Sequence, residues 1–572
     1  MAKWGTKQAW LYGAALAALA LPTLAQAQVK DYSPVTQERL SSPEPQNWLM
    51  YRRTYDGHGF SPLNQITADN VKDLVPVWTF STGLIEGHQA PPIVNNGVMF
   101  VATPQAQVIV LDAKTGDLLW RYKRQLPEDL TQLHPTNHGV ALLGDKLYIA
   151  TVDDFLVALD AKTGKELWAK PVEDYRKGYY MTLAPLIADG KVMVGSSGGE
   201  FGVRGFVAAY DPQTGDQLWR TYTIPGPGEP GNNTWPGDTW KNGGGSVWIT
   251  GTYDPDTKTA YWGTGNAAPW MGDARSGDNL NTSSVLALDV DTGKITGSHQ
   301  YHWNDAWDWD EVDAPLLIDI ERDGRTIKSL VHPGRDGYLW TLERKPTGIS
   351  FVAGVPFVRQ NVFTGLDPET GRPTYDESKK PHLNAHVSFC PSLWGGKDWP
   401  PPAYSQQTKL LYIPANENLC GNLTGHKMDY VPGQLYLGAG LADIGMTLYP
   451  NYDHIGELQA WDLSTGKKVW AHNFNHSQLW GPVLATAGDL VFMGGTSDRM
   501  FRAFDAKTGK TLWEQKTNSG VTGVPVSYEV DGVQYIAVQS GWGVDAQRMQ
   551  DSLNKIDPAT YRSDAVPQGG VV

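Results

Sequence analysis

The chain has 572 residues and a formal charge of −14 at neutral pH. So acidic a chain argues against nucleic acid as a partner, because phosphates demand basic surface, whereas a basic protein partner is permitted. Its 62 glycines, 23 tryptophans and 25 tyrosines are typical of many short strands joined by tight turns.

The N-terminal segment resembles an export signal. Lys3 and Lys7 precede an apolar run from about Ala9 to Leu24, and a small-residue cleavage site follows at 25–27. We expect residues 1–27 to be a signal peptide and residues 28–572 to form a single domain in the periplasm. A membrane anchor is the alternative, but the run is short for a spanning helix. No later segment is long and apolar enough, so we expect no stable membrane span.

A ten-residue phrase then recurs along the chain. It reads as an apolar residue and Asp, a turn that ends in Gly, and a short strand that ends in Trp. Clear copies occupy residues 111–120, 159–168, 210–219, 461–470 and 504–513. The glycine supplies the positive φ that a tight turn needs. With the apolar segments ahead of it, each copy predicts a small antiparallel sheet of about four strands.

The spacing of the repeat predicts the architecture. Successive clear copies, marked by Trp78, Trp120, Trp168 and Trp219, lie 42 to 51 residues apart, which matches a propeller blade. Filling the chain at this period predicts an all-β, eight-bladed β-propeller. We expect each terminal Trp to dock between adjacent blades. A bare propeller has no defined activity, so the function must come from residues set among the repeats.

Acids and an amide in unusual local contexts are the first candidates. Glu200 and Asn266 lie in the glycine-rich segments 195–205 and 263–270, and Asp308 and Asp310 alternate with tryptophans. On an extended segment the two aspartates point the same way and repel each other, unless a cation lies between them. Three carboxylates and an amide oxygen form a hard-oxygen set that suits calcium or a similar cation. The alternative for Glu200 is a solvated acid in a glycine turn.

The two cysteines, Cys390 and Cys420, predict a structural disulfide in an oxidising compartment. They cannot provide the attachment motif of a c-type haem. Any electrons that the protein collects must therefore leave to a separate carrier.

From about Trp48 to Gly543 the chain resembles the quinoprotein alcohol dehydrogenases, the methanol dehydrogenase-like enzymes that use pyrroloquinoline quinone (PQQ). The resemblance implies that Glu200, Asn266 and Asp308 bind the metal ion and that Asp308 is also the catalytic base. Arg335 matches the arginine that hydrogen-bonds the quinone oxygens. Asp310 is similar to an extra aspartate of lanthanide-using members, so we favour a lanthanide(III) ion over Ca²⁺, since three carboxylates suit a trivalent charge.

The resemblance also implies the PQQ contacts. Trp248 matches the tryptophan beneath the PQQ plane, and further contacts fall on Thr182, Ser197, Gly198, Gly199, Ser246, Asp398 and Trp480. The chain departs from the family in three places. Gln132 and Leu133 replace a pair of adjacent cysteines, His138 stands where the family has an arginine, and Gln89 where an acid is common. Leu133 or His134 could cover the ring instead.

These features predict a PQQ- and metal-dependent dehydrogenase that oxidises an alcohol to an aldehyde or ketone. The family implies that the metal polarises the quinone, that Asp308 takes the alcohol proton, and that a soluble c-type cytochrome accepts the electrons. Two alternatives stay open at this point. One is a PQQ dehydrogenase for sugars, polyols or bulky secondary alcohols, and the other is a non-enzymatic envelope propeller. A homodimer is compatible with the sequence.

Overall fold

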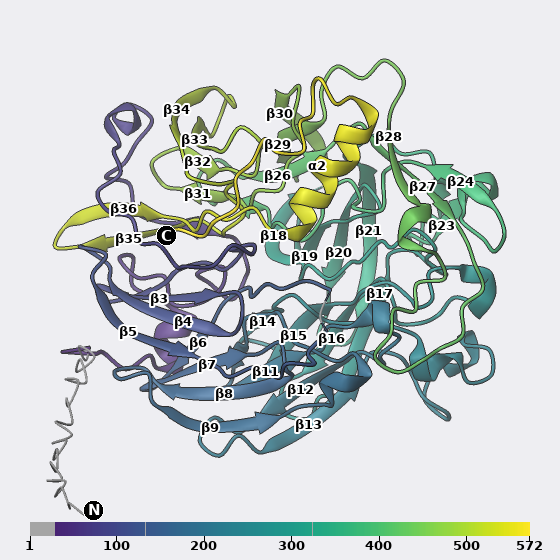
Figure 1. Cartoon of the computed structure of the whole chain (residues 1–572), viewed down its shortest axis with the longest axis horizontal. Coiled ribbons are helices and arrows are strands. Elements are labelled where there is room, and N and C mark those ends of the chain that lie inside the picture. The colour runs from purple at the N-terminus through teal and green to yellow at the C-terminus, as the bar shows by residue number, and fades with distance from the viewer. Residues whose placement is uncertain (1–28, 132, 323) are drawn as a thin grey trace, which may run out of the picture.

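The computed structural model describes residues 29–131, 133–322 and 324–572. The predicted signal peptide over residues 1–27 and the lid residue Gln132 lie outside the described residues. Antiparallel sheets follow one another around a central axis, as Figure 1 shows. Across the described part of the chain, no helix has both the length and the apolar character needed to cross a membrane. The all-β propeller architecture is confirmed.

Five sheets of four strands follow each other in the first part of the chain. The first contains β2 (Ile93–Asn95), β3 (Val98–Thr103), β4 (Gln107–Asp112) and β5 (Leu118–Lys123). The second contains β6 (Ala141–Leu143), β7 (Lys146–Ala150), β8 (Phe155–Asp160) and β9 (Glu166–Pro171). The third contains β10 (Leu186–Ala188), β11 (Lys191–Gly195), β12 (Phe206–Tyr210) and β13 (Gln217–Tyr222). The fourth contains β14 (Thr252–Asp254), β15 (Thr259–Gly263), β16 (Ser284–Asp289) and β17 (Ile295–Gln300). The fifth contains β18 (Leu316–Arg322), β19 (Arg325–Pro333), β20 (Tyr338–Arg344) and β21 (Ile349–Pro356).

The later sheets are less regular. One contains β25 (Ala403–Tyr404), β26 (Leu410–Asn416), β29 (Gly456–Asp462) and β30 (Lys467–Phe474). The next contains β31 (Leu484–Thr486), β32 (Leu490–Met493), β33 (Met500–Asp505) and β34 (Thr511–Lys516), and β1 (Phe60–Ser61) joins it as a fifth, parallel strand. The strands β35 (Val526–Val530) and β36 (Val533–Ala537) pair alone. Because the last pair would have to serve as a whole blade, the count of eight blades stays a prediction.

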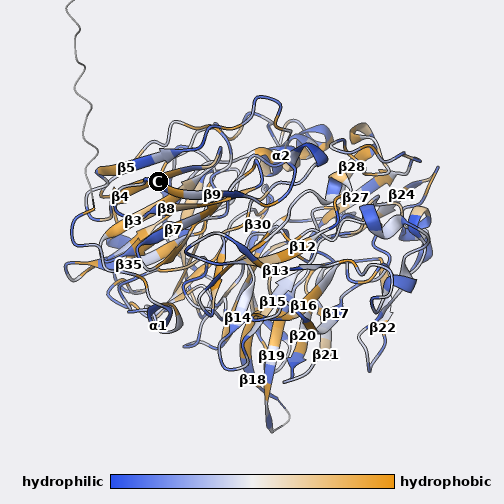
Figure 2. Ribbon diagram, turned by 90° about the horizontal axis from the view of Figure 1, so that it is seen from below, coloured by the Kyte–Doolittle hydropathy of each residue, from blue (hydrophilic) through white to orange (hydrophobic). Residues whose placement is uncertain are grey.

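Among the described residues, two short sheets and two α-helices lie outside these sheets. The short sheets are β22 (Phe363–Leu366) with β23 (Pro373–Tyr375), and β24 (His386–Phe389) with β27 (Leu419–Thr424) and β28 (Ile444–Leu448). The helices are α1 (Gln37–Ser41) and α2 (Val544–Ile556). Hydrophobic residues concentrate on the strands in Figure 2, whereas α2 is largely hydrophilic. The longer helix α2 is a feature that the sequence reasoning missed.

The repeat places one tryptophan against the next glycine turn. Trp120 is fully buried, its Nε1 donates to the carbonyl of Ala161 at 3.2 Å, and a Cβ on Gly164 would lie 2.5 Å from its ring. Gly164 also has φ +71°, so both the turn and the docking ring require glycine. The same arrangement pairs Trp78 with Gly116, Trp168 with Gly215, Trp219 with Gly293, and Trp470 with Gly509. The predicted docking of the repeat tryptophans is confirmed.

The ring is closed by segments from both ends of the chain. Trp513 on β34 donates its Nε1 to the carbonyl of Leu74 at 2.9 Å. Phe80 and Val572 exchange two backbone hydrogen bonds of 3.1 and 2.9 Å. The segment from Leu74 to Phe80 therefore lies between the sheet that ends in β34 and the first sheet, β2 to β5, and it pairs with the C-terminal residues.

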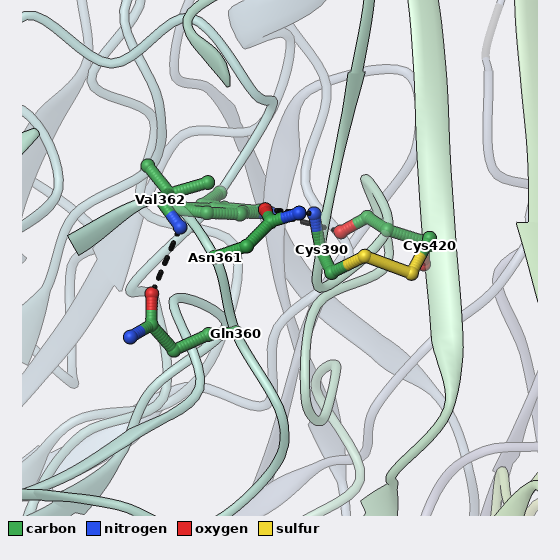
Figure 3. The surroundings of a disulfide bond; sticks show 7 residues. Gln360, Asn361, Val362, Cys390 and Cys420 are labelled. Carbon is green, nitrogen blue, oxygen red and sulfur yellow. Dashed lines mark hydrogen bonds between the residues drawn. A yellow bond between two sulfur atoms is a disulfide. The ribbon is translucent and has the colours of Figure 1, made fainter. Parts of the chain in front are cut away.

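The predicted disulfide is present between Cys390 and Cys420 and ties β27 to the loop after β24 (Figure 3). Asn361 reinforces this loop, because its side-chain oxygen accepts from the backbone N–H of Cys390 at 2.8 Å. The cross-link lies in the part of the chain that supplies one wall of the cavity described next.

Candidate active site

A cavity of about 330 Å³ collects side chains from distant parts of the chain. Of the residues singled out from the sequence, the cavity is lined by Gln89, His138, Thr182, Ser197, Gly198, Glu200, Trp248, Asp308, Asp310, Arg335 and Asp398. These residues lie mainly in loops that connect the strands of successive sheets. A propeller forms a site over its axis from loops of this kind.

A short turn aims two aspartates into this cavity. Trp307 and Trp309 are fully buried and stack at 4.9 Å between ring centroids, while Asp308 and Asp310 line the cavity. The two aspartates thus share one side, as the alternation predicts. The expected extended backbone is wrong, however, because Asp308 has φ +65°. A non-glycine residue in this region is strained, and such strain persists only where the surrounding contacts enforce it.

Asp310 is held from three sides. One oxygen accepts from the backbone N–H of Asn266 at 2.7 Å, and the other accepts from Trp248 Nε1 at 3.1 Å and lies 3.4 Å from Arg335 Nη1. Burial raises the pKa of Asp310 to about 7, with the charge of Arg335 opposing and that of Glu200 adding to the rise. Burial likewise raises the pKa of Asp308 well above its usual value. Buried carboxylates in such numbers call for a compensating cation.

Two buried oxygens at the site have no hydrogen-bond partner, namely Asn266 Oδ1 and Asp308 Oδ1. Buried polar atoms are nearly always satisfied in folded proteins, so these two await a ligand. Glycines bring the donors close together. A Cβ on Gly265 would lie 2.3 Å from Asp310 Oδ1, and one on Gly199 would lie 3.7 Å from Asn266 Oδ1. Gly199 begins the short 3-10 helix η3 (Gly199–Phe201), which carries Glu200. The donor set fits a hard cation.

Arg335 links the aspartates to the far wall of the cavity. Its Nη1 donates to the carbonyl of Asp308 at 2.7 Å, and its Nη2 donates to the carboxylate of Asp398. Although burial opposes its charge, the surrounding carboxylates, Asp398 first, raise the pKa of Arg335 above its usual value. Arg335 is therefore a fixed cation at the edge of the cavity.

Comparison with known proteins agrees with this geometry. The model of the glucose/ethanol/alcohol dehydrogenase β-propeller domain, a PQQ family, matches residues 48–353 and 456–536. Quinoprotein alcohol dehydrogenase PedH of Pseudomonas putida is 40% identical over 556 residues, which cover 92% of this chain and 91% of that protein. The chain belongs to the PQQ-dependent alcohol dehydrogenases. This membership excludes the non-enzymatic envelope propeller.

Two further relatives of this dehydrogenase carry informative names. Methanol dehydrogenase [cytochrome c] subunit 1 of Methylorubrum extorquens is 35% identical over 570 residues, covering 92% of this chain and 89% of that one. A solved europium-containing methanol dehydrogenase superposes with a TM-score of 0.87 at 35% identity, covering 93% of this chain and 98% of that chain. PQQ with calcium or a lanthanide is therefore the cofactor set of this dehydrogenase.

Two positions at which the sequence departs from the predicted family pattern, His138 and Gln89, carry no charge in this dehydrogenase. His138 Nδ1 donates to the carbonyl of Thr182 at 3.1 Å, and burial lowers the pKa of His138 to about 3. It therefore brings no charge at the position where the resemblance predicts an arginine. Gln89 accepts from Thr136 Oγ1 at 2.8 Å, and Thr182 Oγ1 lies 3.2 Å from Ser197 Oγ.

Four predicted contacts of the dehydrogenase lie outside the cavity lining, namely Gly199, Ser246, Asn266 and Trp480. Ser246 Oγ would lie 3.0 Å from a Cβ on Gly199, so it backs the same group of oxygens. Trp480 packs in a fully buried cluster with Trp399 and Trp542.

The mouth of the dehydrogenase cavity holds residues that the sequence reasoning missed. Helix α2 presents Asp545, Arg548, Asp551 and Lys555 to the cavity. His134 Nδ1 lies 3.0 Å from Asp545 Oδ2, and Arg548 Nη1 lies 3.5 Å from the other oxygen. Both candidate lid residues, Leu133 and His134, line the cavity. The polar positions of α2 recur at helical spacing, a signal that could have predicted a helix.

Proposed function

We propose that this enzyme works in the periplasm, oxidises an alcohol to an aldehyde or ketone, and passes the electrons to a soluble c-type cytochrome. The observation that carries the proposal is the convergence of Glu200, Asp308 and Asp310 at one cavity, with Asn266, whose side-chain oxygen has no partner, bonded to Asp310 through its backbone N–H. The cytochrome is supported by the named methanol dehydrogenase relative. It is also supported by the cysteines, which are both engaged in the disulfide.

The four oxygen-bearing residues would hold the metal ion. Glu200, Asp308 and Asp310 together bring a formal charge of −3, counted as one per carboxylate. A trivalent lanthanide gains more from that charge than calcium does. The europium-containing relative supports the same choice.

The protein's own groups divide the remaining work. When bound, PQQ supplies the electron-accepting carbonyl chemistry. Trp248, which is tied to Asp310, offers a flat face for the ring, and Arg335 directs its guanidinium N–H groups toward the cavity edge. Asp308 would take the hydroxyl proton of the alcohol on its carboxylate, which lines the cavity.

The cavity walls bear on the substrate class. Apolar side chains line part of the cavity, namely Trp270, Leu393, Trp394, Leu437 and Leu441. This apolar lining favours alcohols with an apolar body, including bulky secondary ones, over sugars and polyols, because a sugar would leave its hydroxyl groups unpaired there.

Asp308→Ala tests the proposal. Apoprotein is reconstituted with PQQ and either Ca²⁺ or La³⁺, and dye-linked oxidation is measured on primary, secondary and polyol substrates. We expect turnover to be abolished while PQQ binding and the circular dichroism spectrum persist. Asp551→Ala, an acid at the cavity mouth, is the matched control. Unchanged turnover would remove Asp308 from its role, and a wild-type protein that binds no PQQ would overturn the whole proposal.

The location and assembly are proposals of the same kind. The signal peptide over residues 1–27, the single domain over 28–572 and the homodimer are checked by N-terminal sequencing of the periplasmic fraction and by sedimentation. A mature chain that begins at Met1 would contradict the first of these.

A further inference from the structure

Behind the cavity lies a second group of ionisable side chains, which the dehydrogenase chemistry does not use. It consists of His302, Asp305, Glu311, His332 and Asp336, and each is at most 2% exposed. We call it the histidine–carboxylate cluster. Three buried carboxylates in one place are strongly unfavourable unless cations offset them.

His302 lies at the centre of this cluster. Its Nε2 is 3.0 Å from Asp305 Oδ1, and its Nδ1 is 3.6 Å from Glu311 Oε1 and 3.7 Å from Asp336 Oδ2. Protonated, the imidazole faces all three carboxylates with a single charge. Among the other cations near the cluster, Arg335 and Lys397 pair with Asp398 and Asp313, and Arg275 donates to the backbone carbonyl of Asp305.

Asp305 holds the turn that carries the metal-binding aspartates. Its carboxylate accepts from the backbone N–H groups of Asp308 at 3.2 Å and Trp309 at 3.3 Å. The two bonds fix the backbone at Asp308 and at the residue after it. Asp308 has a strained φ of +65°, and these bonds help to hold it in that conformation.

Glu311 holds the turn that carries Arg335. Its Oε2 accepts from the backbone N–H of Arg335 at 3.1 Å, and its Oε1 accepts from that of Asp336 at 3.2 Å. His332 Nε2 lies 2.6 Å from the same Oε2. The two carboxylates thus fix two different active-site turns, and His302 is the side chain that joins them.

We propose that His302 is a positioning residue that locks the Asp308 turn and the Arg335 turn in register before the metal ion and PQQ bind. The inference rests on the proposed function and goes beyond it, because His302 touches neither the cavity nor the candidate ligands. Outer contacts of this kind change metal affinity or activity by about 10- to 100-fold when removed.

A second metal site is the competing explanation for the cluster, since His302, Glu311 and Asp336 offer ligand atoms within 4.8 Å of one another. The observed bonds favour positioning. Both oxygens of Glu311 already accept backbone N–H bonds, and Asp336 Oδ2 accepts from Trp340 Nε1 at 2.9 Å.

The test compares His302→Gln with His299→Gln. His299 lies on β17, just before His302 in the chain, and contacts the aromatic rings of Phe351 and Trp340. Tb³⁺ and PQQ affinities are titrated on each apoprotein, and kcat and KM are measured after reconstitution. We expect His302→Gln to bind Tb³⁺ at least 10-fold more weakly and to lose at least 10-fold in kcat at nearly unchanged KM. His302→Lys, which restores a cation, should recover part of both losses.

Asp305→Asn keeps the proposal falsifiable if His302→Gln does not fold, because it removes the charge that faces His302 while its one carbonyl oxygen can still accept the backbone bond from Trp309. It should show the same loss of Tb³⁺ affinity. Wild-type affinity and kcat in a folded variant, or a lower melting temperature alone, would overturn the inference. Two tightly held metal ions in the wild type and one in His302→Gln would replace it with the second metal site. Failure of the wild type itself to bind PQQ would instead refute the proposed function.

Discussion

Asp310→Asn should shift the metal preference of this dehydrogenase from trivalent toward divalent ions. The substitution preserves size and removes one ligand charge next to Asn266 and Trp248. With a metal–oxygen distance of about 2.4 Å and an effective dielectric constant of about 20, one carboxylate attracts a trivalent ion about 7 kcal/mol more strongly than a divalent one. A water molecule that replaces the carboxylate recovers part of this difference. Since 1.4 kcal/mol is a factor of ten, we expect selectivity for La³⁺ over Ca²⁺ to fall by at least about 100-fold.

The assay is a reconstitution titration. Apoprotein with saturating PQQ is titrated with La³⁺ or Ca²⁺, and the concentration at half-maximal dye-linked activity is compared between the two ions. Asp551→Asn provides the control, because it removes the same charge from the cavity mouth. An unchanged ratio in Asp310→Asn, or an equal change in Asp551→Asn, would refute the reasoning that Asp310 selects the trivalent ion.

Three further predictions concern stability. Trp120→Ala removes a fully buried ring, which typically costs about 3–5 kcal/mol, so the melting temperature should drop by more than in Trp168→Ala, whose ring is partly exposed. Burial lowers the pKa of His88 to about 4, so the folded protein loses stability as the pH falls below 6.5, the pKa of a free histidine. At pH 5 this one group lowers the free energy of unfolding by about 2 kcal/mol. His88→Gln should therefore narrow the difference in melting temperature between pH 7 and pH 5. Cys390→Ser removes the disulfide to Cys420, which closes a loop of 30 residues and stabilises the fold by about 3 kcal/mol. The substitution should speed hydrogen exchange in β27, and unchanged exchange would contradict a stabilising role.

The fold could be predicted because the repeat encodes contacts that are local or made with the next sheet. Asp112 caps its own turn by accepting from the N–H groups of Lys114 and Thr115, and Gly116 accommodates the ring of Trp78. Such residues have one role wherever the phrase recurs. The sequence therefore indicated sheets, turns and docking together.

The candidate site was predictable only where an acid stood in an unusual context, as Asp308 and Asp310 do between tryptophans. The contact of His134 with Asp545 joins residues 411 positions apart, and no local pattern announces it. Glu311 escaped notice for a related reason. Its partners, His302 and the Arg335 turn, are brought to it by packing between β17, β19 and the loops between them, so its role exists only in the folded chain.

The pairing of Phe80 with Val572 has a consequence for how the molecule is made. Synthesis delivers the chain from its N-terminus onward, so the first sheet emerges long before its closing neighbour. Until residues 571–572 arrive, Phe80 and Ser81 lack their backbone partners on that side of the ring. The nascent ring is therefore an open arc until residues 571–572 pair with Phe80 and Ser81.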